Sequence, residues 1–175
     1  VATIQLQNAG RQVLQEGAVD QGDGVRFVTG CRRDHVAGRC WGQEDRVGLV
    51  LARREEMTPS QLDDFLNKRS GMLGIAGVSD MRDIEERREA GNGAAMLAFD
   101  VYIHRLRAYL GAYIAQLGGV DVISFTAGVG ENSPLVRAAA LETLGFLGVR
   151  VDPARNEERR RGIRVISTDD SAVTV

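Results

Sequence analysis

The stretch Phe125–Arg137 has the sequence FTAGVGENSPLVR and joins an apolar segment to a helix start through two glycines. The β-branched residues of Val120–Phe125 predict a short buried strand. Thr126–Asn132 is expected to be a loop. Ser133-Pro134 predicts a helix start, because serine caps helices and proline fits their first turn. This order of strand, glycine loop and helix, followed by further strand candidates, predicts an α/β domain.

The glycine loop is the main chemical signal in the sequence. Gly128 and Gly130 lack side chains and can adopt positive φ, so a ligand could approach this backbone closely. The free N–H groups at the following helix start favour an anion or a polar ring edge. A plain strand-to-helix turn is the alternative reading. The loop lacks the third glycine of the dinucleotide fingerprint, and no Gly-Lys-Ser/Thr follows, so a Walker P-loop is excluded.

The flanking sequence predicts mainly helices. Thr58–Gln61 has the pattern of a capping box, and Gly71 is expected to stop the helix that it opens. A long helix is expected from about Asn92 to Gly118-Gly119, because apolar residues recur at spacings of three and four. These residues are Phe99, Ile103, Leu106, Leu110, Tyr113 and Leu117. The helix after Pro134 is expected to reach about Leu147, with Val149–Val151 and Ile163–Ile166 as further strands.

A second candidate site follows another glycine turn, at Ser79–Asp83. Asp80 could accept a hydrogen bond from a ribose hydroxyl, and Arg82 could stack on a base or pair with a phosphate. The alternative is a helix start with acidic residues and a solvated arginine. The charge runs Glu85–Arg88 and Arg159–Arg161 are interpreted as solvated faces.

The composition limits the classes of partner. The chain has 175 residues, enough for one domain, and 24 acidic against 22 basic residues give a net charge of −2. This balance predicts no binding to nucleic acid or to an anionic membrane. Cys31 and Cys40 are too few and too oddly spaced for a disulfide framework or a zinc site, and no metal site is predicted. Val1–Gly10 has no signal-peptide pattern, which favours a cytoplasmic protein.

Residues 1–50 and 51–175 differ in how regular their hydrophobic patterns are. In the first segment only Val1–Leu6 and Val47–Leu51 form short apolar elements, and no helical or strand period lasts. The second segment carries every regular pattern described above. We therefore expect a poorly patterned segment over 1–50 and a nucleotide-binding domain over 51–175.

Four stretches, in this order, resemble the acetate kinase family of the sugar-kinase/actin-like superfamily. They are LNKRSGMLGIAGVSDMRDI, LAFDVYIHRLRAYLGAYIAQLGGVDVISFTAGVGENSPLVR, LGFLGVRVD and VISTDDSAV. The resemblance covers about residues 48–175. It implies an actin-like ATPase (ribonuclease H-like) domain, the C-terminal half of a two-domain kinase whose active site lies in the cleft between the domains.

The resemblance also implies chemistry and partners. Family members transfer a phosphoryl group between ATP and acetate, giving ADP and acetyl phosphate, use Mg²⁺, and are expected to be homodimers. The residues implied to bind the adenosine are Asp80, Met81, Arg82, Gly128, Val129, Gly130 and Asn132. Arg39 matches an arginine that contacts the carboxylate or the transferring phosphoryl group. Asn8 matches the asparagine of a phosphate loop.

Departures from the family pattern leave alternatives open. Gln5 stands where the family has a histidine, and Trp41 interrupts the segment around Arg39. A reading-frame error and genuine divergence would both produce such a loss of similarity. The family's catalytic acids and magnesium ligands have no counterpart here, so we expect a fragment, truncated at its C-terminus, that is inactive alone. A non-catalytic adenine-nucleotide-binding module and a fragment of a propionate or butyrate kinase are the alternatives.

Overall fold

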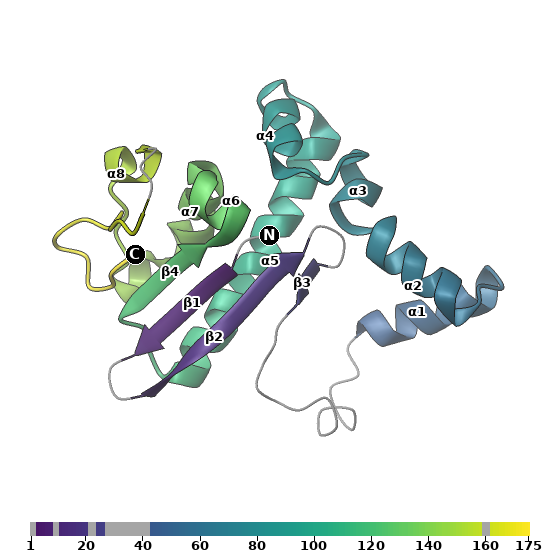
Figure 1. Cartoon of the computed structure of the whole chain (residues 1–175), viewed down its shortest axis with the longest axis horizontal. Helices are drawn as coiled ribbons and strands as arrows, with labels where there is room; N and C mark the ends of the chain where they lie inside the picture. Colours follow the sequence, from purple (N-terminus) through teal and green to yellow (C-terminus); the bar gives the residue numbers. More distant parts are fainter. Residues whose placement is uncertain (1–2, 9–10, 21–23, 27–42, 159–161) are drawn as a thin grey trace.

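The computed structural model describes residues 3–8, 11–20, 24–26, 43–158 and 162–175. Within this part of the chain, one small sheet has helices behind it and to its sides, and no helix covers the face turned toward the viewer in Figure 1. The combination of helices with a sheet agrees with the α/β expectation at the level of secondary-structure content.

The sheet draws its strands from distant parts of the sequence. They are β1 (Thr3–Asn8), β2 (Arg11–Asp20), β3 (Gly24–Arg26) and β4 (Val122–Thr126). The order is β3-β2-β1-β4, and each neighbouring pair is antiparallel. The predicted strand before the glycine loop is confirmed as β4. The N-terminal segment, which showed little periodicity, supplies the other three strands of the same sheet.

The long helix α5 (Gly93–Leu117) is confirmed with both of its ends. The side chain of Asn92 accepts a hydrogen bond from the Ala95 amide at 2.9 Å, and Gly118 ends the helix with a φ of 72°. Its apolar stripe is buried in the core together with Leu6 and Ile123 of the sheet. The long helix therefore packs against the sheet.

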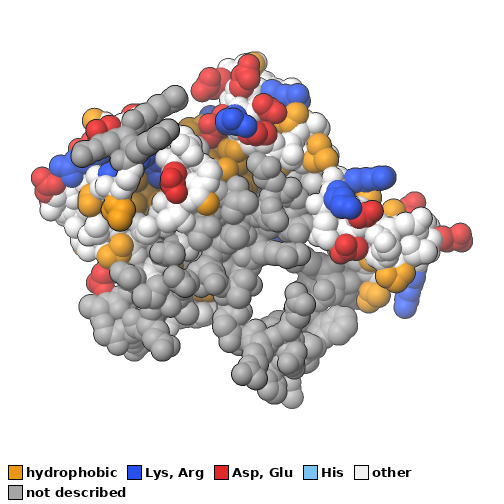
Figure 2. All heavy atoms as spheres, viewed as in Figure 1, with side chains coloured by type: hydrophobic (Ala, Val, Ile, Leu, Met, Phe, Trp, Pro, Cys, Tyr) orange, Lys and Arg blue, Asp and Glu red, His pale blue; other side chains and the backbone are white. Residues whose placement is uncertain are grey.

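Two helices form an arm that lies away from the sheet in Figure 1: α1 (Gln43–Arg54) and α2 (Pro59–Lys68). The predicted capping box is confirmed, because Thr58 and Gln61 exchange hydrogen bonds at the start of α2. The predicted stop at Gly71 is wrong: α2 ends at Lys68, and Gly71 begins α3 (Gly71–Ala76). Apolar side chains show on the surface of the arm in Figure 2, where Leu49, Val50 and Leu66 are exposed.

Five helices of the described residues remain. They are α4 (Met81–Glu89), α6 (Ala127–Asn132), α7 (Pro134–Leu141), the 3₁₀ helix η1 (Glu142–Leu147) and α8 (Pro153–Glu157). The loop expected over Thr126–Asn132 is instead a helix, α6. The helix expected through Leu147 changes to 3₁₀ geometry after Leu141.

The C-terminal segment returns along β4. The Ile123 amide donates to the Thr174 carbonyl at 2.8 Å, on the edge of β4 that β1 does not occupy. Among the described residues, regular strands do not form over Val149–Val151 or Ile163–Ile166. The C-terminal segment instead has two isolated bridges, between Val151 and Ser167 and between Thr174 and Val122 of β4.

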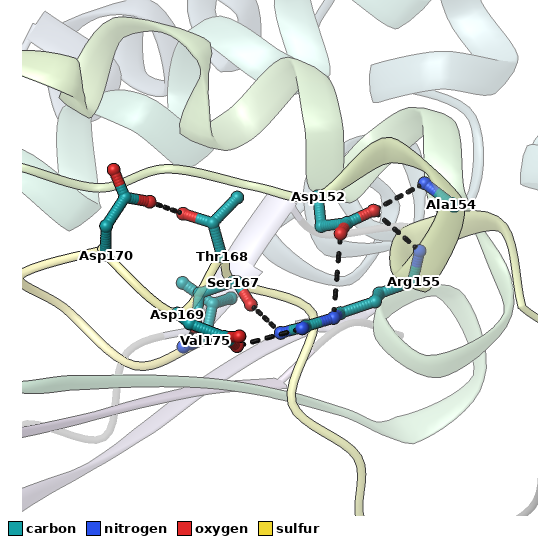
Figure 3. A network of polar contacts seen from close by, with 8 residues as sticks. All are labelled: Asp152, Ala154, Arg155, Ser167, Thr168, Asp169, Asp170 and Val175. Atoms are coloured by element: carbon teal, nitrogen blue, oxygen red, sulfur yellow. Dashed lines mark hydrogen bonds and ion pairs between the residues drawn. The ribbon is translucent and has the colours of Figure 1, made fainter.

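Arg155 cross-links this segment, as Figure 3 shows. Its guanidinium donates to the Ser167 carbonyl at 2.7 Å and pairs with Asp169 at 2.8 Å and with Asp152 at 3.6 Å. These contacts hold α8 against the returning chain.

Among the described residues, no helix combines the length and the apolar character that a membrane span requires.

Candidate functional site

The junction between β4 and α6 contains an unusual backbone conformation. Ala127, the first residue of α6, has a φ of 61°. Gly128 and Gly130, which were expected to supply positive φ, do not. They lie within the helix instead. The turn therefore uses an alanine in the left-handed region, which L-residues rarely adopt because Cβ crowds the backbone.

The residues of α6 divide into an inner and an outer set. Gly130 is buried, and a Cβ added to it would lie 3.5 Å from the Phe125 backbone, which is ordinary van der Waals contact, so this residue of α6 packs on β4. Gly128 and Asn132 are exposed, and Val129 is half-buried. The Asn132 amide donates to the Gly128 carbonyl at 2.7 Å.

The second predicted segment begins α4. Asp80 is its N-cap: one carboxylate oxygen accepts from the Arg82 backbone amide at 2.9 Å. The Arg82 side chain donates back to the same carboxylate from Nε at 3.0 Å and from Nη2 at 2.6 Å. These bonds lower the pKa of Asp80 to about 2. The Arg82 side chain is 87% exposed, whereas Met81 is buried in the core.

A side-chain contact joins the two predicted segments. Ser133, between α6 and α7, donates to Glu85 of α4 at 2.5 Å and accepts from the Val136 amide at 3.0 Å. Ser133 is 5% exposed. The interpretation of Glu85 as part of a solvated face is therefore wrong, because its carboxylate is the acceptor of a partly buried hydrogen bond. The contact brings the start of α4 to the end of α6.

Sequence reasoning missed a buried cation behind the glycine helix. Arg137 of α7 is 3% exposed and donates to the carbonyls of Gly130 and Glu131 at 2.9 and 2.8 Å. It also binds Asn156 of α8, which is 3% exposed. Burial, with a smaller effect of Arg164, lowers the pKa of Arg137 to about 10. The sequence shows only that Arg137 lies three residues after Pro134, the first residue of α7.

Two predicted residues are not brought into this site by the described structure. Arg39 lies outside the described residues, as do His35, Cys31, Cys40 and the run Arg159–Arg161. Asn8 ends β1, where it pairs with Arg11 in the strand ladder; its side chain is not described.

No three His, Cys, Asp or Glu side chains of the described ranges gather closely enough to hold a metal ion.

The profile of the Acetokinase family matches residues 38–175. The chain belongs to the acetokinase family. The match includes both segments that Ser133 and Glu85 join, and it confirms the resemblance given by the sequence motifs.

Two curated relatives of this acetokinase chain carry the name acetate kinase. The protein from Leifsonia xyli subsp. xyli is 52% identical over 141 residues, which are 80% of this chain and 36% of that protein. The protein from Corynebacterium efficiens is 42% identical over 177 residues, covering 99% of this chain and 43% of that protein.

A solved structure is also similar. The crystal structure of Porphyromonas gingivalis acetate kinase has a TM-score of 0.69 and 41% sequence identity, over 74% of this chain and 33% of that one. The acetokinase chain thus spans less than half the length of the relatives that it matches.

Proposed function

We propose that this chain supplies the adenosine-binding wall of an acetate kinase, as part of an actin-like C-terminal domain. In the reaction, a carboxylate oxygen of acetate attacks the γ-phosphorus of ATP. An O–P bond forms, the bond to the β,γ-bridging oxygen breaks, and ADP leaves with that oxygen. Proteins contribute to such transfers mainly by positioning groups and neutralising charge.

The observation that carries the proposal is the hydrogen bond from Ser133 to Glu85. It joins two segments that each offer groups suited to a nucleoside. Arg82 offers a planar, exposed cation, with two of its nitrogens held by Asp80. Asn132 keeps its amide oxygen as an acceptor while its nitrogen donates to Gly128.

The proposal divides the chemistry between this chain and the rest of the enzyme. Asp80, Arg82, Gly128, Val129 and Asn132 hold the nucleotide, while Met81 and Gly130 support the wall from the core. Arg39 and Asn8 keep their proposed contacts with the transferred phosphoryl group. Mg²⁺ supplies charge neutralisation in the full-length enzyme, which we propose to be a homodimer. No step is assigned to the ion, because the described residues contain no group of three or more His, Cys, Asp or Glu side chains that could hold it.

Binding of ADP to the 175-residue chain tests the wall. Calorimetry should give a Kd on the order of 0.1–1 mM, because only one side of a cleft is present. Arg82→Gln and Asn132→Ala should each weaken binding by about tenfold, since each removes a hydrogen bond or a charge contact to the ligand.

Arg150→Gln is the matched control, because Arg150 forms a comparable exposed pair with Asp170 at the other end of the described structure. Its ADP affinity should equal that of the wild type. Equal losses in all variants, or no ADP binding by the wild type, would contradict the assignment of the nucleotide site.

The isolated chain should make no acetyl phosphate above background in a hydroxamate assay. Groups on one wall cannot replace oriented groups on the other. Robust turnover by the purified 175-residue chain would refute this division of the chemistry.

A further inference from the structure

Helix α6 cannot owe its shape to its own sequence. It has six residues, two of them glycine, and it begins at Ala127 in the left-handed region. Helices this short are unstable alone, and glycine lowers their stability further. Contacts from outside the helix backbone must therefore hold it.

Side chains meet both ends of α6. At its N-terminus, the Glu131 carboxylate accepts from the Ala127 amide at 3.0 Å. At its C-terminus, Arg137 Nη1 donates to the Gly130 and Glu131 carbonyls at 2.9 and 2.8 Å. The partial charges at the two ends of a helix favour this arrangement, with an anion at the first turn and a cation at the last.

Asn156 of α8 holds the Arg137 guanidinium in place. Arg137 Nε donates to Asn156 Oδ1 at 2.8 Å, and Nη2 donates to the Asn156 carbonyl at 2.6 Å. The Asn156 amide in turn donates to the Pro134 carbonyl at 3.0 Å. All of these acceptors are uncharged oxygens. Burying a charged guanidinium among neutral acceptors costs free energy of desolvation. What the buried Arg137 provides is a fixed arrangement of N–H donors.

We propose that Arg137 is a positioning residue of the nucleotide site: it holds α6 so that Gly128 and Asn132 face the ligand while Gly130 rests on β4. The inference rests on the proposed function for the identity of the ligand. Arg137 does not touch the nucleotide. It acts through the carbonyls of Gly130 and Glu131, and Asn156 keeps it in place.

Arg137→Lys keeps the charge but loses the planar fork, so it tests geometry and not charge alone. Asn156→Ala is the second variant, in case the first fails to fold. Arg107→Lys is the matched control. The Arg107 Nε donates to the Ala139 carbonyl of α7 at 2.9 Å, and none of the hydrogen bonds that Arg107 makes with the described residues reaches α6.

Calorimetry with ADP on the full chain gives the first readout. Arg137→Lys and Asn156→Ala should each raise the Kd for ADP by about tenfold, at a temperature where unfolding curves show every variant folded. Arg107→Lys should change the Kd by less than about twofold, even where its loss of thermal stability is similar. Wild-type affinity in both test variants would overturn the inference.

Amide hydrogen exchange of the ligand-free chain gives the second readout. In Arg137→Lys and in Asn156→Ala, the amides of residues 127–133 should exchange faster than in the wild type, whereas the exchange rates of α5 should be unchanged. In Arg107→Lys, residues 127–133 should exchange as in the wild type. Unchanged exchange in residues 127–133 of both test variants overturns the inference. If the wild-type chain binds no ADP, the proposed function fails, and the exchange rates alone decide whether Arg137 holds α6.

Discussion

The Asp80 carboxylate accepts hydrogen bonds from both the backbone amide and the side chain of Arg82. They lower its pKa from 3.8 to about 2. Because the folded pKa lies below the unfolded one, the resulting stabilisation is complete above pH 3.8 and is lost as the pH falls through about 2. An NMR titration of the Asp80 carboxyl carbon should therefore have its midpoint near pH 2.

Arg82→Gln should raise that midpoint toward 3.8 but not fully, because the backbone amide at position 82 still donates to Asp80. Arg150→Gln should leave it unchanged, since Arg150 pairs with Asp170. A wild-type midpoint at the ordinary value of 3.8 would show that the pair does not form in solution.

Single residues also show the limits of reading function from sequence. The ligand contact predicted for Gly130 stays a prediction; the structure shows that Gly130 is buried and that an added Cβ would lie 3.5 Å from the Phe125 backbone. Glu85 sits in a run of charges, and nothing local distinguishes it from its exposed neighbour Glu86. Its partner Ser133 comes from a distant helix start, so only the fold could show the contact.

At the scale of elements, Ser133 links α4 to α7 while it caps α7. Ser133→Ala should lower the free energy of unfolding by about 1–3 kcal/mol, because it removes the cap and leaves Glu85 without its donor. A double-mutant cycle with Glu85→Ala, measured by urea denaturation, should give a coupling energy of about 1 kcal/mol.

Glu86→Ala is the matched control for this cycle, since Glu86 is the exposed neighbour of Glu85 on α4. Its coupling energy with Ser133→Ala should be zero within error. Equal coupling for the two glutamates would mean that the contact between α4 and α7 contributes nothing specific.

Elements with local causes were predictable from the sequence, and those with distant causes were not. The start of α2 and both ends of α5 depend on caps within a few residues, and all three were predicted closely. Helix α6 was predicted as a loop because its two glycines disfavour a helix, while its supports, Arg137 and Asn156, act through the tertiary structure. The residues of strand β2 show no lasting alternation of apolar and polar side chains, and the strand is placed by its antiparallel pairing with β1.

For the whole molecule, Gly148 fixes where the C-terminal segment turns back. Its φ is 80°, its carbonyl accepts from the Ala172 amide at 3.0 Å, and a Cβ added to it would lie 2.6 Å from the Ala172 Cβ. Gly148→Ala should lower the free energy of unfolding by about 2–4 kcal/mol, combining backbone strain with overpacking. Urea denaturation followed by circular dichroism measures this loss.

Gly91→Ala separates the two causes, because Gly91 has a φ of 78° and nothing within 4 Å of an added Cβ. It should cost only the strain, about 1–2 kcal/mol. If both substitutions cost the same, the contact with Ala172 plays no part in holding the C-terminal segment.

The pairing of β1 with β4 has a consequence for the chain as it is synthesised. Strand β1 emerges from the ribosome before α1 to α5, and β4 emerges after them. At ordinary elongation rates, the edge of β1 that pairs with β4 stays unpaired for roughly ten seconds, until β4 has been synthesised. An open strand edge can pair with another nascent chain. Translation speed, and chaperones that cover this edge, should therefore affect the yield of native protein.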